Sequence, residues 1–180
     1  IAVDGTRAAI VEVNSETDFV ARNEQFQSIV ENVAKLALQA GGDVHVLSEM
    51  PYPGSARSVS AELTDAIAKI GENMTLRRMV TVEAPLVVSY VHNAAAPNMG
   101  KIGVLVALES AAPADVLQPL GKQLAMHIAA ANPQALTGED LDPATIERER
   151  AIATEKATES GKPADIVAKM VDGAIAKFRK

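Results

Sequence analysis

Cysteine is absent from this sequence of 180 residues, and so is tryptophan. Without cysteine the chain can form no disulfide framework, no thiolate metal site and no cysteine nucleophile, which fits a reducing compartment. Aromatic residues make up only 3% of the chain, and the formal net charge is −6. Because nucleic-acid binding favours basic patches and stacking rings, this composition argues against a direct nucleic-acid partner.

Long apolar runs and familiar chemical motifs are also missing. No segment approaches the roughly 20 apolar residues of a transmembrane helix, and the first five residues lack the basic and apolar regions of a signal peptide. No G-x-x-x-x-G-K-[ST] phosphate loop occurs, and His45, His92 and His127 are too scattered for a zinc site. Acids such as Glu147 and Glu149 alternate with arginines, which is typical of a solvated helix face rather than of acid–base catalysis. We therefore expect a non-enzyme with no catalytic residues, no metal and no cofactor.

The hydrophobic content of 48% supplies one large core or two small adjoining ones. Segments whose apolar residues alternate as in a strand and segments with the apolar spacing of a helix follow one another along the chain. This pattern predicts an α+β fold. Ala84-Pro85 is the best boundary, between a first subdomain at 1–84 and a second at 85–180, and the two must adjoin because strand character resumes at once. Strands are expected at 8–13, 76–82, 86–91 and 102–108, the last two as an antiparallel hairpin, and helices at 23–40, from Ser60 to Gly71, at 115–131, from Pro143 and from Pro163.

The expected helix at 115–131 has a broad apolar stripe. His127 lies beside this stripe, about one turn from Leu124, and a lone histidine there is ordinarily a core-edge residue with one hydrogen bond. The residues expected to face inward are Val116, Leu117, Leu120, Leu124, Ile128 and Ala131.

The stretch that most needs explaining is VEVNSETDFVARNEQFQ, residues 11–27, in which strand alternation stops at polar residues and helical spacing then begins. Ser15 followed three residues later by Asp18 resembles a capping box, which predicts a short helix. Asn23 is expected to be the N-cap of the next, longer helix. Phe19 therefore lies on a connector, where its ring either fills the core or projects from the surface.

The segment N-S-E-T-D-F-V-A-R-N, from Asn14, resembles the signature of the elongation factor Ts family, usually N-C-x-T-D-F-V-A-[RK]-N. Ser15 replaces the common cysteine, a small polar change. Further similar segments cover nearly the whole chain: KIGENMTLRR, IGVLVALE, QLAMHIAAANP and SGKPADIVAKMVDG.

This resemblance implies a translation elongation factor that promotes GDP release from elongation factor Tu by displacing magnesium and distorting the nucleotide site. It implies two adjoining subdomains, each a small antiparallel sheet packed with helices. The implied partner is elongation factor Tu, both GDP-bound and nucleotide-free. The residues assigned to magnesium displacement are Thr17, Asp18, Phe19 and Val20, and further partner contacts are Arg22, Asn23, Gly103, Met126 and His127.

Several alternatives stay open at this point. Gly103 is explained equally by close packing within a strand, and Lys101 stands where many relatives have arginine, so a forked donor there cannot be assumed. A non-catalytic scaffold or adaptor is the second function to consider, and a small enzyme the third.

The resemblance also implies that this chain is the core region of a longer protein. Relatives have a small helical module before this point, and they extend beyond the segment that ends this chain. The first residue of this chain, Ile1, is not methionine. The expected location is the bacterial cytoplasm, which is favoured over an organellar matrix. A homo-oligomer is compatible with these observations.

Overall fold

The computed structural model of the chain describes residues 1–179 and has the expected α+β fold, with antiparallel sheets of three and two strands packed with helices. Residue contacts divide it into two compact units, of which the first is Ile1–Ala131 and the second begins at Asn132. None of the helices within residues 1–179 combines the length and the apolar character needed to cross a membrane.

The first sheet has the strand order β1-β2-β3, formed by Ala2–Asp4, Arg7–Ser15 and Met74–Glu83. Between Glu12 and Val13 the register of β2 against β3 shifts, so a β-bulge precedes the end of β2. Bulges bend a strand and re-aim the residues that follow. Here those residues lead directly into α1, Asp18–Ala21.

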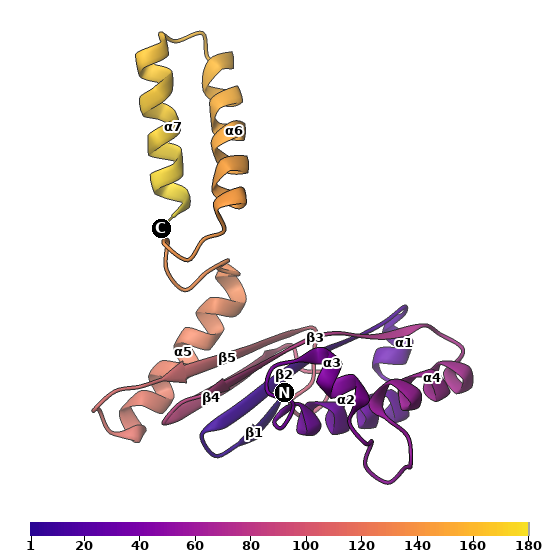
Figure 1. The fold of residues 1–180 in the computed structure, drawn as a ribbon. Helices are drawn as coiled ribbons and strands as arrows, with labels where there is room; N and C mark the ends of the chain where they lie inside the picture. The colour runs from indigo at the N-terminus through magenta and orange to yellow at the C-terminus, as the bar shows by residue number, and fades with distance from the viewer. Residues whose placement is uncertain (180) are drawn as a thin grey trace. The chain divides into compact units, whose positions relative to one another are not determined.

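Three longer helices pack with this sheet and enclose the main core (Figure 1). They are α2, Glu24–Ala37; α3, Val44–Glu49; and α4, Val59–Ile70. Their apolar faces bury a cluster against the sheet, because helical residues three and four apart share one face. Its members include Phe26, Ile29, Val33, Ala37, Leu47, Val59, Leu63, Met74 and Met79.

Several features of this region differ from the sequence prediction, which assigned no strand to β1 and extended the helix after Asn23 to Ala40, three residues beyond the end of α2. The N-cap of α4 is Ser58, whose Oγ accepts from the Ala61 N–H at 3.3 Å, and not Ser60. The helix α3, to which the apolar periodicity assigned no element, begins after Asp43, whose carboxylate accepts from the His45 and Val46 N–H groups. The predicted end of α4 at Gly71 is confirmed, since this residue has a φ of 83°, a conformation that glycine adopts without strain.

The second sheet is the predicted antiparallel hairpin, formed by β4, Leu86–His92, and β5, Ile102–Leu108. The boundary predicted at Ala84-Pro85 falls in the connection between β3 and β4, and the division into subdomains at 1–84 and 85–180 stays a prediction. The helix α5, Ala114–Ala131, packs against both strands of the hairpin (Figure 1).

The predicted inward face of α5 is largely wrong. The buried residues are Leu117, Gly121 and Ala125, whereas Val116, Leu120 and Leu124 are exposed. Small residues let the helix approach the hairpin closely: a Cβ built at Gly121 would lie 2.6 Å from Cγ2 of Val88. Close approach therefore selects the small-residue face and leaves the larger apolar side chains outside.

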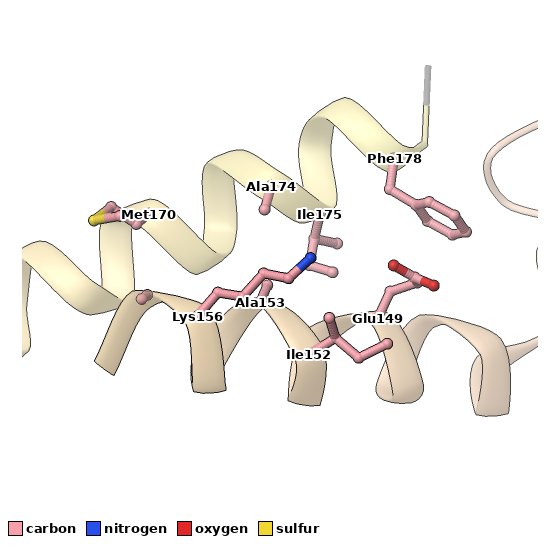
Figure 2. Close-up of a pocket in the computed structure, with 9 residues that line it drawn as sticks. Glu149, Ile152, Ala153, Lys156, Met170, Ala174, Ile175 and Phe178 are labelled. Carbon is pink, nitrogen blue, oxygen red and sulfur yellow. The ribbon is translucent and has the colours of Figure 1, made fainter. Parts of the chain in front are cut away.

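The second unit contains α6, Pro143–Glu159, and α7, Ala164–Phe178, which pack against each other. Asp142 caps α6 as predicted, and Pro163 precedes α7. A groove of about 270 Å³ runs between the helices; at one end, the Glu149 carboxylate lies opposite the Phe178 ring (Figure 2). Other lining residues are Ile152, Ala153, Lys156, Ala157, Met170, Ala174 and Ile175.

Candidate functional site: the α1 turn and the outer face of α5

Phe19 projects from the surface. Its side chain is 86% exposed, whereas that of the next residue, Val20, is 5% exposed and belongs to the main core. The interpretation of Phe19 as a core plug is therefore wrong. A single turn of helix has buried the smaller apolar residue and left the larger one in solvent, so the Phe19 ring is accessible to a partner.

The N-cap of α1 is Thr17 and not Ser15. The Val20 N–H donates to Thr17 Oγ1 at 3.5 Å, and Thr17 has the extended backbone typical of an N-cap. Ser15, still paired with Met74 in the β2–β3 ladder, donates its hydroxyl to the Thr17 carbonyl at 3.3 Å. The predicted capping box fails because the strand continues through Ser15 and leaves Thr17 as the first residue free to cap.

Both ends of α1 are hydrogen-bonded to other elements. At its start, Glu72 accepts from the Thr17 N–H at 3.1 Å and from the Thr17 hydroxyl at 2.7 Å. At its end, the Gln27 amide donates to the Ala21 carbonyl at 3.0 Å. These contacts fix a helix that is far too short to persist alone.

Asp18, the first residue of α1, forms an ion pair with Lys101, whose Nζ lies 2.8 Å from Asp18 Oδ1. The hydrogen bond and the positive charge of Lys101 lower the pKa of Asp18, and the charge of Arg22 adds a smaller effect in the same direction. Both side chains of the ion pair are mostly exposed, so water screens the interaction. Lys101, which immediately precedes β5 in the loop of the β4–β5 hairpin, thus places a cation beside the α1 turn.

We expect Lys101→Ala to raise the pKa of Asp18 toward its ordinary value, because the hydrogen bond and the nearby cation are both lost. A lowered carboxylate pKa stabilises the fold above the pKa of the unfolded state, and this effect disappears as the pH falls. Since the Asp18 side chain is mostly exposed and water screens the ion pair, the melting temperature at neutral pH should hardly change. A carbon-13 NMR titration of Asp18 provides the measurement; an unchanged pKa would show that the ion pair does not form in solution.

Arg22 and Asn23 connect α1 to α2. Arg22 is the C-cap of α1, where its backbone N–H donates to the Phe19 and Val20 carbonyls, and its side chain is exposed. Asn23 is the N-cap of α2 as predicted, and its Oδ1 accepts from the Phe26 N–H at 3.1 Å. Asn23 therefore has a structural role whether or not it contacts a partner.

Met126 and His127 lie on α5. Both are exposed, so the interpretation of His127 as a core-edge residue is wrong. Helical spacing places His127 on the same face as Val116, Leu120 and Leu124, which lie 11, 7 and 3 positions earlier in the chain. We call these four residues the outer face of α5. It combines three exposed apolar side chains with one imidazole.

Gly103 lies at the packing contact between the two sheets. A Cβ built on it would lie 2.7 Å from Cδ1 of Ile10 and 3.2 Å from Cδ1 of Ile1. A larger residue would require the ends of the Ile10 and Ile1 side chains to shift. This close packing accounts for Gly103 without a partner.

Three of the contacts described above were not predicted from sequence: those that Glu72, Gln27 and Lys101 make with α1. Glu72 is 55 positions from Thr17. No local pattern in the sequence indicates a pairing across that distance, which depends on the turn between α4 and β3.

Comparison with known proteins bears on this site directly. A family model described as "Elongation factor TS" matches residues 16–180, which include Thr17–Asn23, Gly103, Met126 and His127. The chain belongs to the elongation factor Ts family. The family match therefore includes the α1 turn and the outer face of α5.

Curated members of the elongation factor Ts family align along almost the entire chain. The protein named elongation factor Ts from Sphingopyxis alaskensis is 66% identical over an alignment of 182 positions, which covers 99% of this chain and 59% of that protein. The one from Zymomonas mobilis is 59% identical over 100% of this chain and 59% of its own length. The one from Rhizobium meliloti is 52% identical, with shares of 99% and 59%. The chain thus spans about 59% of the length of these relatives.

Proposed function

We propose that this chain is a translation elongation factor that accelerates GDP release from elongation factor Tu, with Phe19 as the group that enters the GTPase. The single observation supporting this most strongly is the exposure of Phe19 on a turn within the residues that match the elongation factor Ts family. In this proposal the chain changes no covalent bond, needs no cofactor and acts in the bacterial cytoplasm.

A GTPase holds its nucleotide through a phosphate loop and a magnesium ion that bridges the phosphates. An exchange factor must weaken those contacts and supply others in their place. We propose that Phe19 enters an apolar cleft beside the nucleotide pocket, while Asp18 engages polar groups near the magnesium and disfavours its binding. Thr17 and Val20 hold the turn in position, the former by capping it and the latter by core packing.

Insertion of the Phe19 ring alone is insufficient for a large change in nucleotide affinity. A shift of 10⁴-fold requires about 5.5 kcal/mol of differential binding. We therefore propose a second contact through the outer face of α5 and Met126, so that the regions 1–84 and 85–180 each supply part of the interface. Arg22 is a further candidate contact because its charged side chain is exposed beside the α1 turn.

The experiment for this function is the release of labelled GDP from elongation factor Tu, followed after adding this chain and excess unlabelled nucleotide. We expect release to accelerate with increasing chain concentration and then to saturate. A release rate that stays at its intrinsic value across a titration in which complex formation is detected would favour a non-catalytic scaffold instead.

His127→Ala should weaken the complex with elongation factor Tu about tenfold, which corresponds to about 1.4 kcal/mol. Its effect on stability should be small because the ring is exposed. Calorimetric titration and thermal unfolding on the same preparation measure both quantities. The matched control is His45→Ala, another exposed histidine on a helix of the first unit. A large fall in melting temperature with unchanged affinity would overturn the contact role.

A further inference from the structure

The start of α1 is fixed by one carboxylate from a distant part of the chain. Glu72 accepts two hydrogen bonds from Thr17, one from its backbone N–H and one from its hydroxyl. Hydrogen bonds to an ionised acceptor are roughly twice as strong as neutral ones. The same Thr17 oxygen accepts from the Val20 N–H, so the three groups form a short chain that ends inside α1.

Glu72 is itself held in place by the fold. It follows Gly71, the C-cap of α4, and precedes β3, whose first residue, Met74, pairs with Ser15. Thr17 lies two positions after Ser15, and Glu72 lies two positions before Met74. Both are therefore just beyond the ends of β2 and β3, where the next pair of an antiparallel ladder would form. A carboxylate therefore extends the connection between the two chain segments at the point where backbone pairing ends.

We propose that Glu72 is a positioning residue for Phe19: it keeps α1 folded as a turn and so holds the exposed ring ready to enter its partner. This inference rests on the proposed function. Four residues cannot sustain a helix unaided. Glu72 is half-buried, whereas the Asp18–Lys101 pair beside it is exposed and screened, so Glu72 makes the larger contribution to this order.

The first test compares GDP release by variants titrated against elongation factor Tu. If the α1 turn is ordered only about one tenth of the time in Glu72→Ala, the half-saturating concentration should rise about tenfold while the saturating rate stays unchanged. Glu72→Gln keeps one carbonyl acceptor and should recover part of the loss. The matched control is Glu83→Ala, which removes an exposed ion-paired glutamate at the opposite end of the β2–β3 ladder and should behave as wild type.

A double variant separates positioning from general stability. Glu72→Ala should add little to the loss in a Phe19→Ala background, because a turn without its ring gains nothing from being held. The changes in melting temperature caused by the two single substitutions should instead add up to the change in the double variant, since Phe19 is in solvent. An equal tenfold loss from Glu72→Ala with and without Phe19 would overturn the assignment.

The second test does not involve elongation factor Tu. Amide hydrogen exchange at Thr17, Val20 and Ala21 should accelerate at least about tenfold in Glu72→Ala, while amides in the middle of β2 keep their wild-type rates. Unchanged exchange in α1 would overturn the role of Glu72. Normal GDP release by Phe19→Ala would instead overturn the proposed function, even if amide exchange in α1 had accelerated in Glu72→Ala as expected. The failure of the Glu72 role and the failure of the proposed function are therefore distinguishable.

Discussion

Phe19→Ala should leave the stability of the fold almost unchanged and strongly impair GDP release from elongation factor Tu. With 86% of its side chain exposed, Phe19 contributes little to the core, and surface substitutions usually change stability by no more than about 0.5 kcal/mol. Aromatic side chains that act as buried hot spots of an interface contribute about 2 kcal/mol or more. That loss corresponds to at least about a thirtyfold fall in affinity.

Thermal unfolding and GDP release measured on one Phe19→Ala preparation check this result. Leu136→Ala is the matched control, since it removes a large apolar side chain that is 96% exposed and lies in the second unit. Asp18→Ala should give a smaller defect than Phe19→Ala. A strongly lowered melting temperature with normal release by the folded fraction would mean that Phe19 supports the fold and not exchange.

Leu47→Ala should have the opposite pattern, a large loss of stability with normal exchange by the folded molecules. Leu47 is fully buried in the main core, where truncation of leucine to alanine costs about 2–5 kcal/mol because a cavity remains. For a protein of this size each kcal/mol lowers the melting temperature by about 2–4 °C. Circular dichroism during heating provides the measurement.

The neighbouring residue supplies the control for Leu47. Val46 lies on the same short helix and is 50% exposed, so Val46→Ala should change the melting temperature far less. Equal destabilisation by the two substitutions would contradict the packing of α3 described above. Together, Leu47→Ala and Phe19→Ala separate the residues that maintain the fold from those that act on the partner.

The sequence predicted most elements of the fold because their signals are local. The β4–β5 hairpin, the caps at Asn23 and Asp142 and the helix end at Gly71 follow from alternation, capping residues and a left-handed glycine. The missed helix α3 is only six residues long, too short for its apolar period to be evident.

The inward face of α5 could not be predicted from apolar periodicity because this helix has two apolar faces. One has small residues, Gly121 and Ala125, and the other has Val116, Leu120 and Leu124. Side-chain size favours burial of the second face, but only the first lets the helix come close to Val88. The choice depends on the shape of the hairpin, which the sequence of the helix does not contain.

The candidate site, like the fold, could be predicted from the sequence only in part. Thr17, Asp18 and Phe19 stood out in the sequence because a polar stretch with one large ring follows a strand. Whether Phe19 was buried could not be predicted, since Val20 beside it is apolar and competes for the same core position. The contacts of α1 with Glu72 and Lys101 were not predicted, because the folded chain alone brings residues 55 and 83 positions from Thr17 and Asp18 beside them.

The most direct test of exchange activity is the affinity of this chain for elongation factor Tu measured in two states, nucleotide-free and saturated with GDP. Linkage requires that the factor by which the chain weakens GDP binding equal the factor by which GDP weakens binding of the chain. We expect the nucleotide-free form to bind at least about tenfold more tightly in calorimetric titrations. Equal affinities would contradict the account, because a protein that binds both states equally cannot shift the equilibrium between them.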